Sequence, residues 1–345
     1  MTRGFRILLV VMLCAALGGG WFAWQQFTWA AEPFRGFSGS EQFVEIPAGT
    51  GPQAIGRLLV NAGVVHDALS WRLALARTGD ATRLKAGEYR FTEAATPAEV
   101  IARLVRGDVY LRTVTFREGL TIRQMAEIYE RAGLGASADF VEAARQGDLV
   151  RDLDPAAATL EGYLFPDTYL LPRRASAEDL VRLMVSRFER AWSDDLRRDA
   201  QRSGFSTREA VTLASIVEKE TGRADERPLV AAVYRNRLGK RMGLQCDPTV
   251  IYALERRGGF DGNLPRADLA LDSPYNTYKH AGLPPGPIAA PGKASLEAAL
   301  RPARVDYLYF VSRNDGSHAF AATLDEHNRN VQKFQVAYFR GRNGR

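Results

Sequence analysis

Two glutamates, in Glu218-Lys219-Glu220, follow directly on an apolar series with helical spacing. On a helix of about 100° per residue, both carboxylates flank the buried stripe, while Lys219 points away from it. Glu220 lies between the directions of Leu213 and Ile216. A carboxyl there can be partly withdrawn from water, which raises its pKa and lets it donate a proton near neutral pH. Periodicity alone slightly favours the simpler alternative, in which both glutamates are solvated residues at the end of a helix.

The two glutamates cannot form the facing pair of carboxylates that an ordinary glycosidase uses. Side chains two positions apart on a helix project about 200° apart. A second carboxylate, if the chemistry uses one, must therefore come from another part of the chain. Asp247 and Asp167 are the two candidates.

Other familiar chemistries lack their residue patterns. No Cys-x-x-Cys or His-x-x-Glu-His spacing occurs, and the histidines are scattered, so a metal site is not expected. Cys246 has no obvious His and Asn partners in the sequence, so we expect a small cleft or core residue rather than a nucleophile. No phosphate-binding glycine loop precedes a helix, and no cofactor is expected.

A rigid helix must position the acid, and the residues before Glu220 predict one. The capping-box sequence Ser206-Thr207-Arg208-Glu209 precedes the apolar series, so a helix should begin after Ser206. Beyond it, segments rich in Gly and Pro that also carry Tyr and Asn are typical of loops that line a cleft. These segments are residues 272–278 and 282–287. A strand at residues 307–311 and a helix from Leu324 should follow.

The part of the chain before residue 200 contains an internal repeat. The corresponding positions include Val44, Ile46 and Gly49 in the first copy and Val114, Phe116 and Gly119 in the second. Each copy has the pattern of a strand, a glycine turn and amphipathic helices, so the sequence predicts two tandem β-α-α-β-α modules. Chance similarity between amphipathic helices is the alternative. The predicted fold class is α+β.

The N-terminus predicts a membrane anchor. Arg3 and Arg6 precede an uncharged stretch at residues 7–24, which is just long enough to cross a bilayer core. The positive-inside rule places residues 1–6 in the cytoplasm and the chain after the span outside, where residues 25–42 form a linker. A cleaved signal peptide is the alternative, and it also leaves the rest of the chain outside.

The formal net charge of the chain is +6 at pH 7. This excess suits an anionic partner, such as an acidic lipid surface or a wall polymer with carboxylated peptides, although a mildly basic solvated surface is an equal alternative. No basic helix with interleaved aromatic residues occurs. The clearest basic run is Arg340, Arg342 and Arg345, in and directly before the Gly-rich tail at residues 341–345. Nucleic acid is therefore not an expected partner.

Several long segments resemble one known family. Residues 214–221, which contain Glu218-Lys219-Glu220-Thr221, and residues 234–238 resemble the YceG-like family of endolytic murein transglycosylases, known as MltG. Further segments look like the family's signatures: residues 244–252, 273–278, 282–288 and 307–311, together with 85–89 and 161–169. Within residues 244–252, the visible departure from the family's pattern is Cys246, where a Thr also occurs in relatives.

The resemblance implies an inner-membrane enzyme that faces the periplasm and acts on nascent peptidoglycan glycan strands, with wall-synthesis enzymes as further partners. It implies a LysM-like module at residues 43–112 and a catalytic domain at 201–340, joined by the second repeat-like module at 113–200. Glu220 matches the family's catalytic acid/base, with Glu218 as the fallback. The polar residues expected to contact or orient the sugar are Asn236, Gln245, Asp247, Tyr275, Asn276, Tyr278, Glu161 and Asp167. Loop structure is the alternative role for Asn236, Gln245, Tyr275 and Asn276.

A lytic transglycosylase needs only one carboxyl group, because the substrate supplies the nucleophile. The acid protonates the glycosidic oxygen between MurNAc and GlcNAc, and the resulting carboxylate deprotonates the MurNAc C6 hydroxyl, which closes onto C1 to give a 1,6-anhydro end. Such cleavage would limit or terminate strand elongation. The alternatives are a non-catalytic, membrane-anchored wall-binding scaffold and a muramidase-type hydrolase that uses Glu220 with Asp247.

Overall fold

The computed structural model describes residues 12–14, 17–21, 31–338 and 340. Most of the predicted anchor at residues 7–24 lies outside the described residues, as do the predicted cytoplasmic segment 1–6 and the tail 341–345. Within the described part of the chain, no helix combines the length and the apolar character that crossing a membrane requires.

The chain divides into two compact units, residues 1–112 and 113–345. In the described residues, helices are combined with three two-stranded sheets. The predicted α+β class is therefore confirmed.

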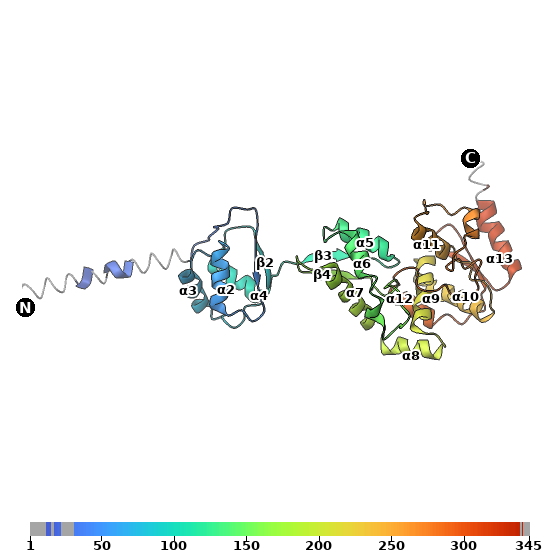
Figure 1. Ribbon diagram of the computed structural model, residues 1–345, viewed down its shortest axis with the longest axis horizontal. Helices are drawn as coiled ribbons and strands as arrows, with labels where there is room; N and C mark the ends of the chain where they lie inside the picture. Colours follow the sequence, from blue (N-terminus) through green and yellow to red (C-terminus); the bar gives the residue numbers. More distant parts are fainter. Residues whose placement is uncertain (1–11, 15–16, 22–30, 339, 341–345) are drawn as a thin grey trace, which may run out of the picture. The chain divides into compact units, whose positions relative to one another are not determined.

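From residue 31 on, the first unit combines a two-stranded sheet with the helices α2, α3 and α4 (Figure 1). Its elements in chain order are β1 (Gln42–Ile46), α2 (Pro52–Asn61), α3 (Ala68–Thr78), β2 (Gly87–Phe91) and α4 (Pro97–Arg106). The strands pair antiparallel, with Val44 opposite Tyr89. Trp71 of α3 is buried in the same core, and its indole N–H donates to the carbonyl of Pro52 at 2.9 Å. The sheet and the three helices thus enclose one hydrophobic core.

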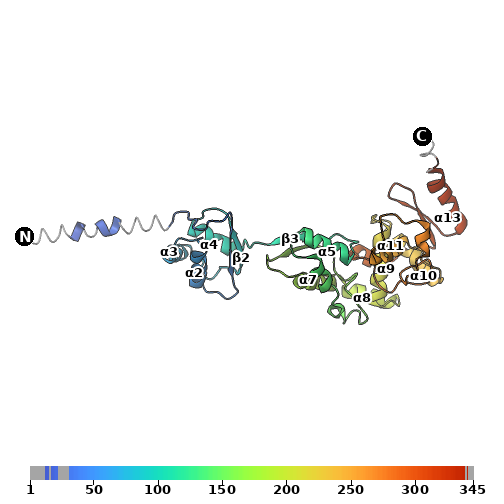
Figure 2. The ribbon, with the colours of Figure 1, turned by 45° about the horizontal axis from the view of Figure 1, so that its top comes forward.

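The first part of the second unit has the same order of elements. They are β3 (Arg112–Thr115), α5 (Ile122–Arg131), α6 (Ser137–Ala143), the short 3-10 helix η1 (Gly147–Val150), β4 (Thr168–Leu171) and α7 (Ala177–Ala191). Strand β3 pairs with β4, and Figure 2 shows α5 and α7 beside β3. The β-α-α-β-α order predicted from the repeat is therefore present twice.

Helix α9 (Thr207–Glu220) occupies the centre of the remaining part of the second unit (Figure 1). Ser206 and Glu209 form the predicted capping box at its start, and every residue from 210 to 217 is buried. The helix ends at Glu220 because Thr221 has extended backbone angles. Four helices pack around it: α8 (Asp194–Arg202), α10 (Arg227–Gly239), α11 (Asp247–Arg257) and α12 (Lys293–Leu300).

The chain after α12 forms a hairpin and a terminal helix. The strand expected at residues 307–311 is β5 (Tyr309–Ser312), and it pairs antiparallel with β6 (His318–Ala321), which the sequence analysis does not predict. Helix α13 (Leu324–Val331) begins at the expected residue. The remaining elements are the 3-10 helix η2 (Arg266–Ala270) and the π-helical turn η3 (Gln332–Val336).

One hydrophobic core runs through the second unit. It joins Phe116 and Phe188, from the β-α-α-β-α part, to Val217 of α9 and Leu296 of α12. The region at 201–340 therefore shares one hydrophobic core with the module that precedes it, and buried side chains of both parts pack in that core.

Candidate active site

Glu220 lies at the C-terminal end of α9 and lines a pocket of about 280 Å³. The other lining side chains come from α10, α11, β5, α13 and the loops between them. The complete lining is Glu220, Tyr234, Arg237, Leu244, Gln245, Asp247, Tyr278, Phe310 and His327. A small pocket with this many hydrogen-bonding groups suits a polar ligand.

The environment of Glu220 favours a protonated carboxyl. Burial raises the pKa of this carboxyl above its usual value, and the nearby charge of Asp247 raises it further. The Tyr234 hydroxyl, which donates to Glu220 Oε1 at 2.5 Å, and the Cys246 thiol oppose this shift without cancelling it. Burial also raises the pKa of Tyr234, so this phenol remains a donor. Glu220 is therefore a fixed carboxyl that can act as a proton donor.

Glu218 points into a different environment. Its side chain is only 6% exposed and forms an ion pair with Arg227 at 3.5 Å. Its carboxylate also accepts a hydrogen bond from the backbone N–H of Gly292 at 3.0 Å, at the start of α12. Glu218 is therefore a buried residue that joins helices, and it does not line the pocket of Glu220.

The start of α11 and the loops that contain Gln245 and Tyr278 also line the pocket. The Tyr278 hydroxyl donates to Asp247 Oδ1 at 2.6 Å. Gln245 has a φ angle of 51°, in the left-handed region, and its N–H donates to the carbonyl of Thr277 at 3.2 Å. The predicted residues Gln245, Asp247 and Tyr278 are therefore brought together with Glu220 in one site.

The two predicted asparagines lie outside this pocket and bind backbone. The Asn236 amide donates to the carbonyls of Val305 and Tyr307 at 2.8 and 2.9 Å. The Asn276 amide is fully buried and donates to the carbonyls of Leu269 and Leu271 at 2.9 and 2.8 Å. Each asparagine thus fixes an irregular segment that has no regular ladder of backbone hydrogen bonds.

The remaining three predicted residues are also away from Glu220. Glu161 and Tyr275 line a second pocket of the same unit. Asp167 accepts a hydrogen bond from Arg187 of α7 at 2.6 Å and lines neither pocket. The structure therefore divides the predicted set between two pockets and the framework around them.

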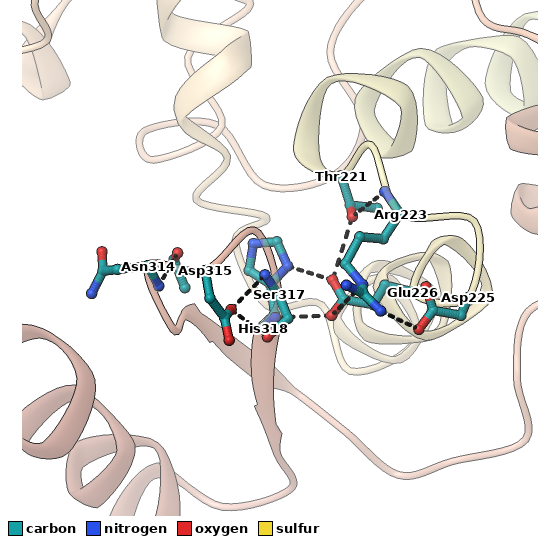
Figure 3. A network of polar contacts seen from close by, with 9 residues as sticks. Thr221, Arg223, Asp225, Glu226, Asn314, Asp315, Ser317 and His318 are labelled. Atoms are coloured by element: carbon teal, nitrogen blue, oxygen red, sulfur yellow. Dashed lines mark hydrogen bonds and ion pairs between the residues drawn. The ribbon is translucent and has the colours of Figure 1, made fainter.

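A polar network fixes the chain directly after Glu220 (Figure 3). Figure 3 shows His318, from β6, pointing toward Glu226, which precedes α10. His318 Nδ1 lies 2.6 Å from Glu226 Oε2, and the backbone N–H of His318 donates to Glu226 Oε1 at 2.9 Å. Thr221 also donates to Glu226, at 3.4 Å, and Arg223 lies 3.6 Å from it. The loop that follows the acid is therefore joined to the β5–β6 hairpin.

Sequence reasoning assigned no role to several residues of the pocket. Tyr234 follows the apolar run of α10, and a buried tyrosine hydroxyl requires a partner, which is the signal that could have identified it. His327 stacks on Tyr309, and burial together with the charge of Arg237 lowers its pKa, so its imidazole is neutral at pH 7.

Among the described residues, no group of three or more His, Cys, Asp or Glu side chains is arranged to hold a metal ion.

The sequence from residue 44 to residue 333 matches the family model described as the YceG-like family. The chain belongs to the YceG-like family. The resemblance predicted from the motifs is thus confirmed. Since the match spans the first β-α-α-β-α module as well as the pocket of Glu220, both are parts of the YceG-like architecture.

Relatives of this YceG-like chain include proteins named endolytic murein transglycosylase. The one from Bacillus subtilis (strain 168) is 31% identical over 319 residues, which cover 88% of this chain and 87% of the relative. The one from Streptococcus pneumoniae serotype 2 (strain D39 / NCTC 7466) is 30% identical over 362 residues, which cover 96% of this chain and 65% of the relative. This YceG-like chain thus spans about two thirds of the pneumococcal protein.

A solved structure also resembles this YceG-like chain. The crystal structure of a yceG-like protein from Listeria monocytogenes is 33% identical in sequence and has a TM-score of 0.57. The match covers 85% of this chain and 99% of the Listeria chain.

Proposed function

We propose that this chain is an endolytic peptidoglycan transglycosylase in which Glu220 is the acid and then the base. The observation that carries the proposal is the Glu220 carboxyl itself, which is withdrawn from water, is held by Tyr234 and lines a polar pocket. Family membership and the names of the relatives supply the substrate class, the glycan strand of murein.

The proposed reaction needs only groups that are present in the pocket and the substrate. Protonated Glu220 donates to the glycosidic oxygen between MurNAc and GlcNAc as the bond from C1 breaks. The carboxylate formed then accepts the proton of the MurNAc C6 hydroxyl, whose oxygen bonds to C1 and gives a 1,6-anhydro end. The Tyr234 hydroxyl stabilises the carboxylate between the two proton transfers. No water is added or released.

The other predicted residues take two kinds of role in this proposal. Gln245, Asp247 and Tyr278 line the pocket and orient the sugar that is cleaved. Asn236 and Asn276 act indirectly, by fixing the segments to which they donate hydrogen bonds.

The decisive experiment is Glu220→Gln in the full-length protein, assayed on purified sacculi. Loss of the proton donor should reduce release of 1,6-anhydro fragments by at least about 10²-fold. The variant should keep the melting temperature of the parent, since glutamine still accepts the Tyr234 hydrogen bond. A folded, fully active variant would falsify the assignment. The same assay also separates an enzyme from a non-catalytic wall-binding scaffold, for which neither protein would release fragments.

A hydrolase is the second candidate, because Asp247 lines the same pocket as Glu220 and its charge acts on the Glu220 carboxyl. In that reaction Asp247 would activate a water molecule. Mass spectrometry separates the two reactions, since a hydrolysed product contains one more water than the anhydro product. If the reaction is hydrolysis, Asp247→Asn should abolish it, while a transglycosylase should retain anhydro products with reduced efficiency.

We also propose that residues 7–24 anchor the chain in the inner membrane and leave both units in the periplasm. The support is the uncharged stretch after Arg3 and Arg6. In that arrangement the module at 43–112, which we propose to be LysM-like, follows the anchor in the chain and precedes the unit that cuts, and both are exposed to the wall-synthesis enzymes that make new strands. Cleavage there would limit strand length. Carbonate extraction of membranes tests the anchor, since a cleaved or soluble chain would be released.

A further inference from the structure

The second unit contains another pocket, of about 430 Å³, which shares no lining residue with the pocket of Glu220. It lies where the β-α-α-β-α part meets α11 and the loops near Tyr275 and Pro287. Its ionisable lining residues are Arg123, Arg145, Arg208, Arg256, Asp154 and Glu161, together with the phenols of Tyr163, Tyr252 and Tyr275. Four guanidinium groups thus face two carboxyl groups.

Two of these arginines are available to a ligand. Arg208 is paired with Asp154 at 2.9 Å, and Arg145 is paired with Glu142 at 2.8 Å. Arg123 and Arg256 are exposed, and neither forms an ion pair with a carboxylate in the described part of the chain. The rim of the pocket therefore presents uncompensated positive charge.

Aromatic rings hold the Arg256 guanidinium in one orientation. It lies 5.2 Å from the ring centroid of Tyr275 and 5.8 Å from that of Tyr252, and the two rings are 5.0 Å apart. Contact with the rings restrains the guanidinium, and the N–H groups that do not face the Tyr275 hydroxyl remain available to a further partner. A planar group with this restraint is suited to bind a carboxylate with two parallel hydrogen bonds.

Inside the pocket, the carboxyl of Glu161 carries little negative charge near neutral pH. Glu161 accepts hydrogen bonds from the Ile122 N–H and the Tyr252 hydroxyl, each at 3.2 Å. Burial raises the pKa of Glu161 to about 7. Close to neutral pH, this carboxyl is therefore often uncharged and does not repel an anion at the rim.

The two pockets are carried by the same rigid elements. Helix α9 contributes Arg208 to this pocket and Glu220 to the other, and their separation of twelve positions corresponds to a rise of about 18 Å. Helix α11 likewise contributes Arg256 here and Asp247 there. An occupant of this pocket therefore lies well beyond the sugars that contact Glu220.

We propose that this pocket binds the carboxylate of a peptide stem on a muramic acid residue that lies along the strand from the cleaved bond. The proposal rests on the proposed function for its substrate class. It assigns Arg123 and Arg256 to the carboxylate and the Tyr252–Tyr275 pair to the peptide backbone and side chains.

The test measures binding in full-length Glu220→Gln protein, so that no cleavage occurs. The probe is a fluorescent muramyl tripeptide with free carboxylates, compared with the same compound amidated and with a MurNAc that carries no peptide and whose lactyl carboxyl is amidated. The free-carboxylate probe should bind at least tenfold more tightly than either comparison compound. Arg123→Gln combined with Arg256→Gln should remove that difference, while Arg182→Gln, an exposed arginine of α7 outside the pocket, should leave it unchanged.

Equal binding of the three probes would overturn the proposal, and so would a preference that survives the double substitution in a protein of unchanged melting temperature. Binding of inorganic diphosphate with the same arginine dependence, without binding of the muramyl tripeptide, would overturn it in favour of a lipid-diphosphate ligand. The proposed function fails separately: if Glu220→Gln still cleaves strands, its assignment is lost, while the binding preference for the carboxylate can still be measured with the uncleavable probe.

Discussion

The hydroxyl of Tyr234 lies 2.5 Å from Oε1 of Glu220, and the two residues come from different helices. Glu220 is the last residue of α9, and Tyr234 lies on the buried side of α10. A short hydrogen bond to a carboxyl that is withdrawn from water fixes its orientation and moderates the rise in its pKa. The contact therefore sets both the orientation of the Glu220 carboxyl and its pKa.

Tyr234→Phe should weaken the acid without unfolding the chain. The ring keeps its edge-to-face contact with Phe310, and loss of one buried hydrogen bond should cost about 1 kcal/mol of stability. The Tyr234 hydroxyl lowers the pKa of Glu220, so its removal raises that pKa, and the alkaline limb of the kcat/KM profile should move to higher pH. The value of kcat should fall by about tenfold. An unchanged pH profile would contradict the role given to Tyr234.

Glu218→Gln should affect stability rather than chemistry. Glutamine still accepts the Gly292 N–H, and Arg227 keeps Glu118 at 3.8 Å as its second partner, so losing the Glu218 charge should cost about 1–2 kcal/mol in denaturant unfolding. The activity of the protein that remains folded should stay near that of the parent. The opposite result, inactivity at unchanged stability, would move the catalytic role from Glu220 to Glu218.

Glu161→Gln should change how stability depends on pH. The folded pKa of about 7 lies above the usual value of 4.5, so the folded chain binds this proton more tightly than the unfolded chain does. The resulting stabilisation is complete below pH 4.5 and is lost as the pH rises to about 7. Across that interval, the parent should lose roughly 1–3 kcal/mol relative to the variant in urea unfolding. Parallel stability curves for the two proteins would show that the Glu161 pKa is not raised.

Cys246 should be inert in the folded protein. Its side chain is 1% exposed, and burial raises the pKa of its thiol well above the usual value, so the nucleophilic thiolate is scarce. Iodoacetamide should label Cys246 only after unfolding, as measured by peptide mass spectrometry, and Cys246→Thr should remain active because threonine supplies a hydroxyl donor. Rapid labelling that parallels loss of activity would instead identify a reactive cysteine.

The sequence was most informative where local rules determine the structure. The start of helix α9 could be predicted, because the capping box at Ser206 and the apolar series after it act within one helix. The separation of Glu218 and Glu220 followed from helical periodicity, and the two carboxyls do reach different environments. Strand β6 was missed because its four residues depend on pairing with β5 for their structure.

Contacts between distant segments could not be predicted in this way. Residue type suggested a sugar-binding role for Asn236 and Asn276, yet both amides donate to backbone carbonyls of irregular segments. An asparagine has the same hydrogen-bonding groups for either task, and only the packed chain decides which partner is near. For the same reason, nothing in the sequence separated Tyr275 and Glu161 from the residues that surround Glu220.

The loop that follows Glu220 can reach its folded arrangement only after the β5–β6 hairpin has been synthesised. Glu226 contacts His318 of that hairpin, and Phe310 and His327 complete the lining of the pocket of Glu220. A ribosome adds these residues about a hundred positions after the acid, so a nascent chain carries Glu220 well before it can complete the pocket around it. In the proposed role, a protein that cuts the wall would thus stay harmless while it is still being exported, and would begin to cut only when its last helix has folded back.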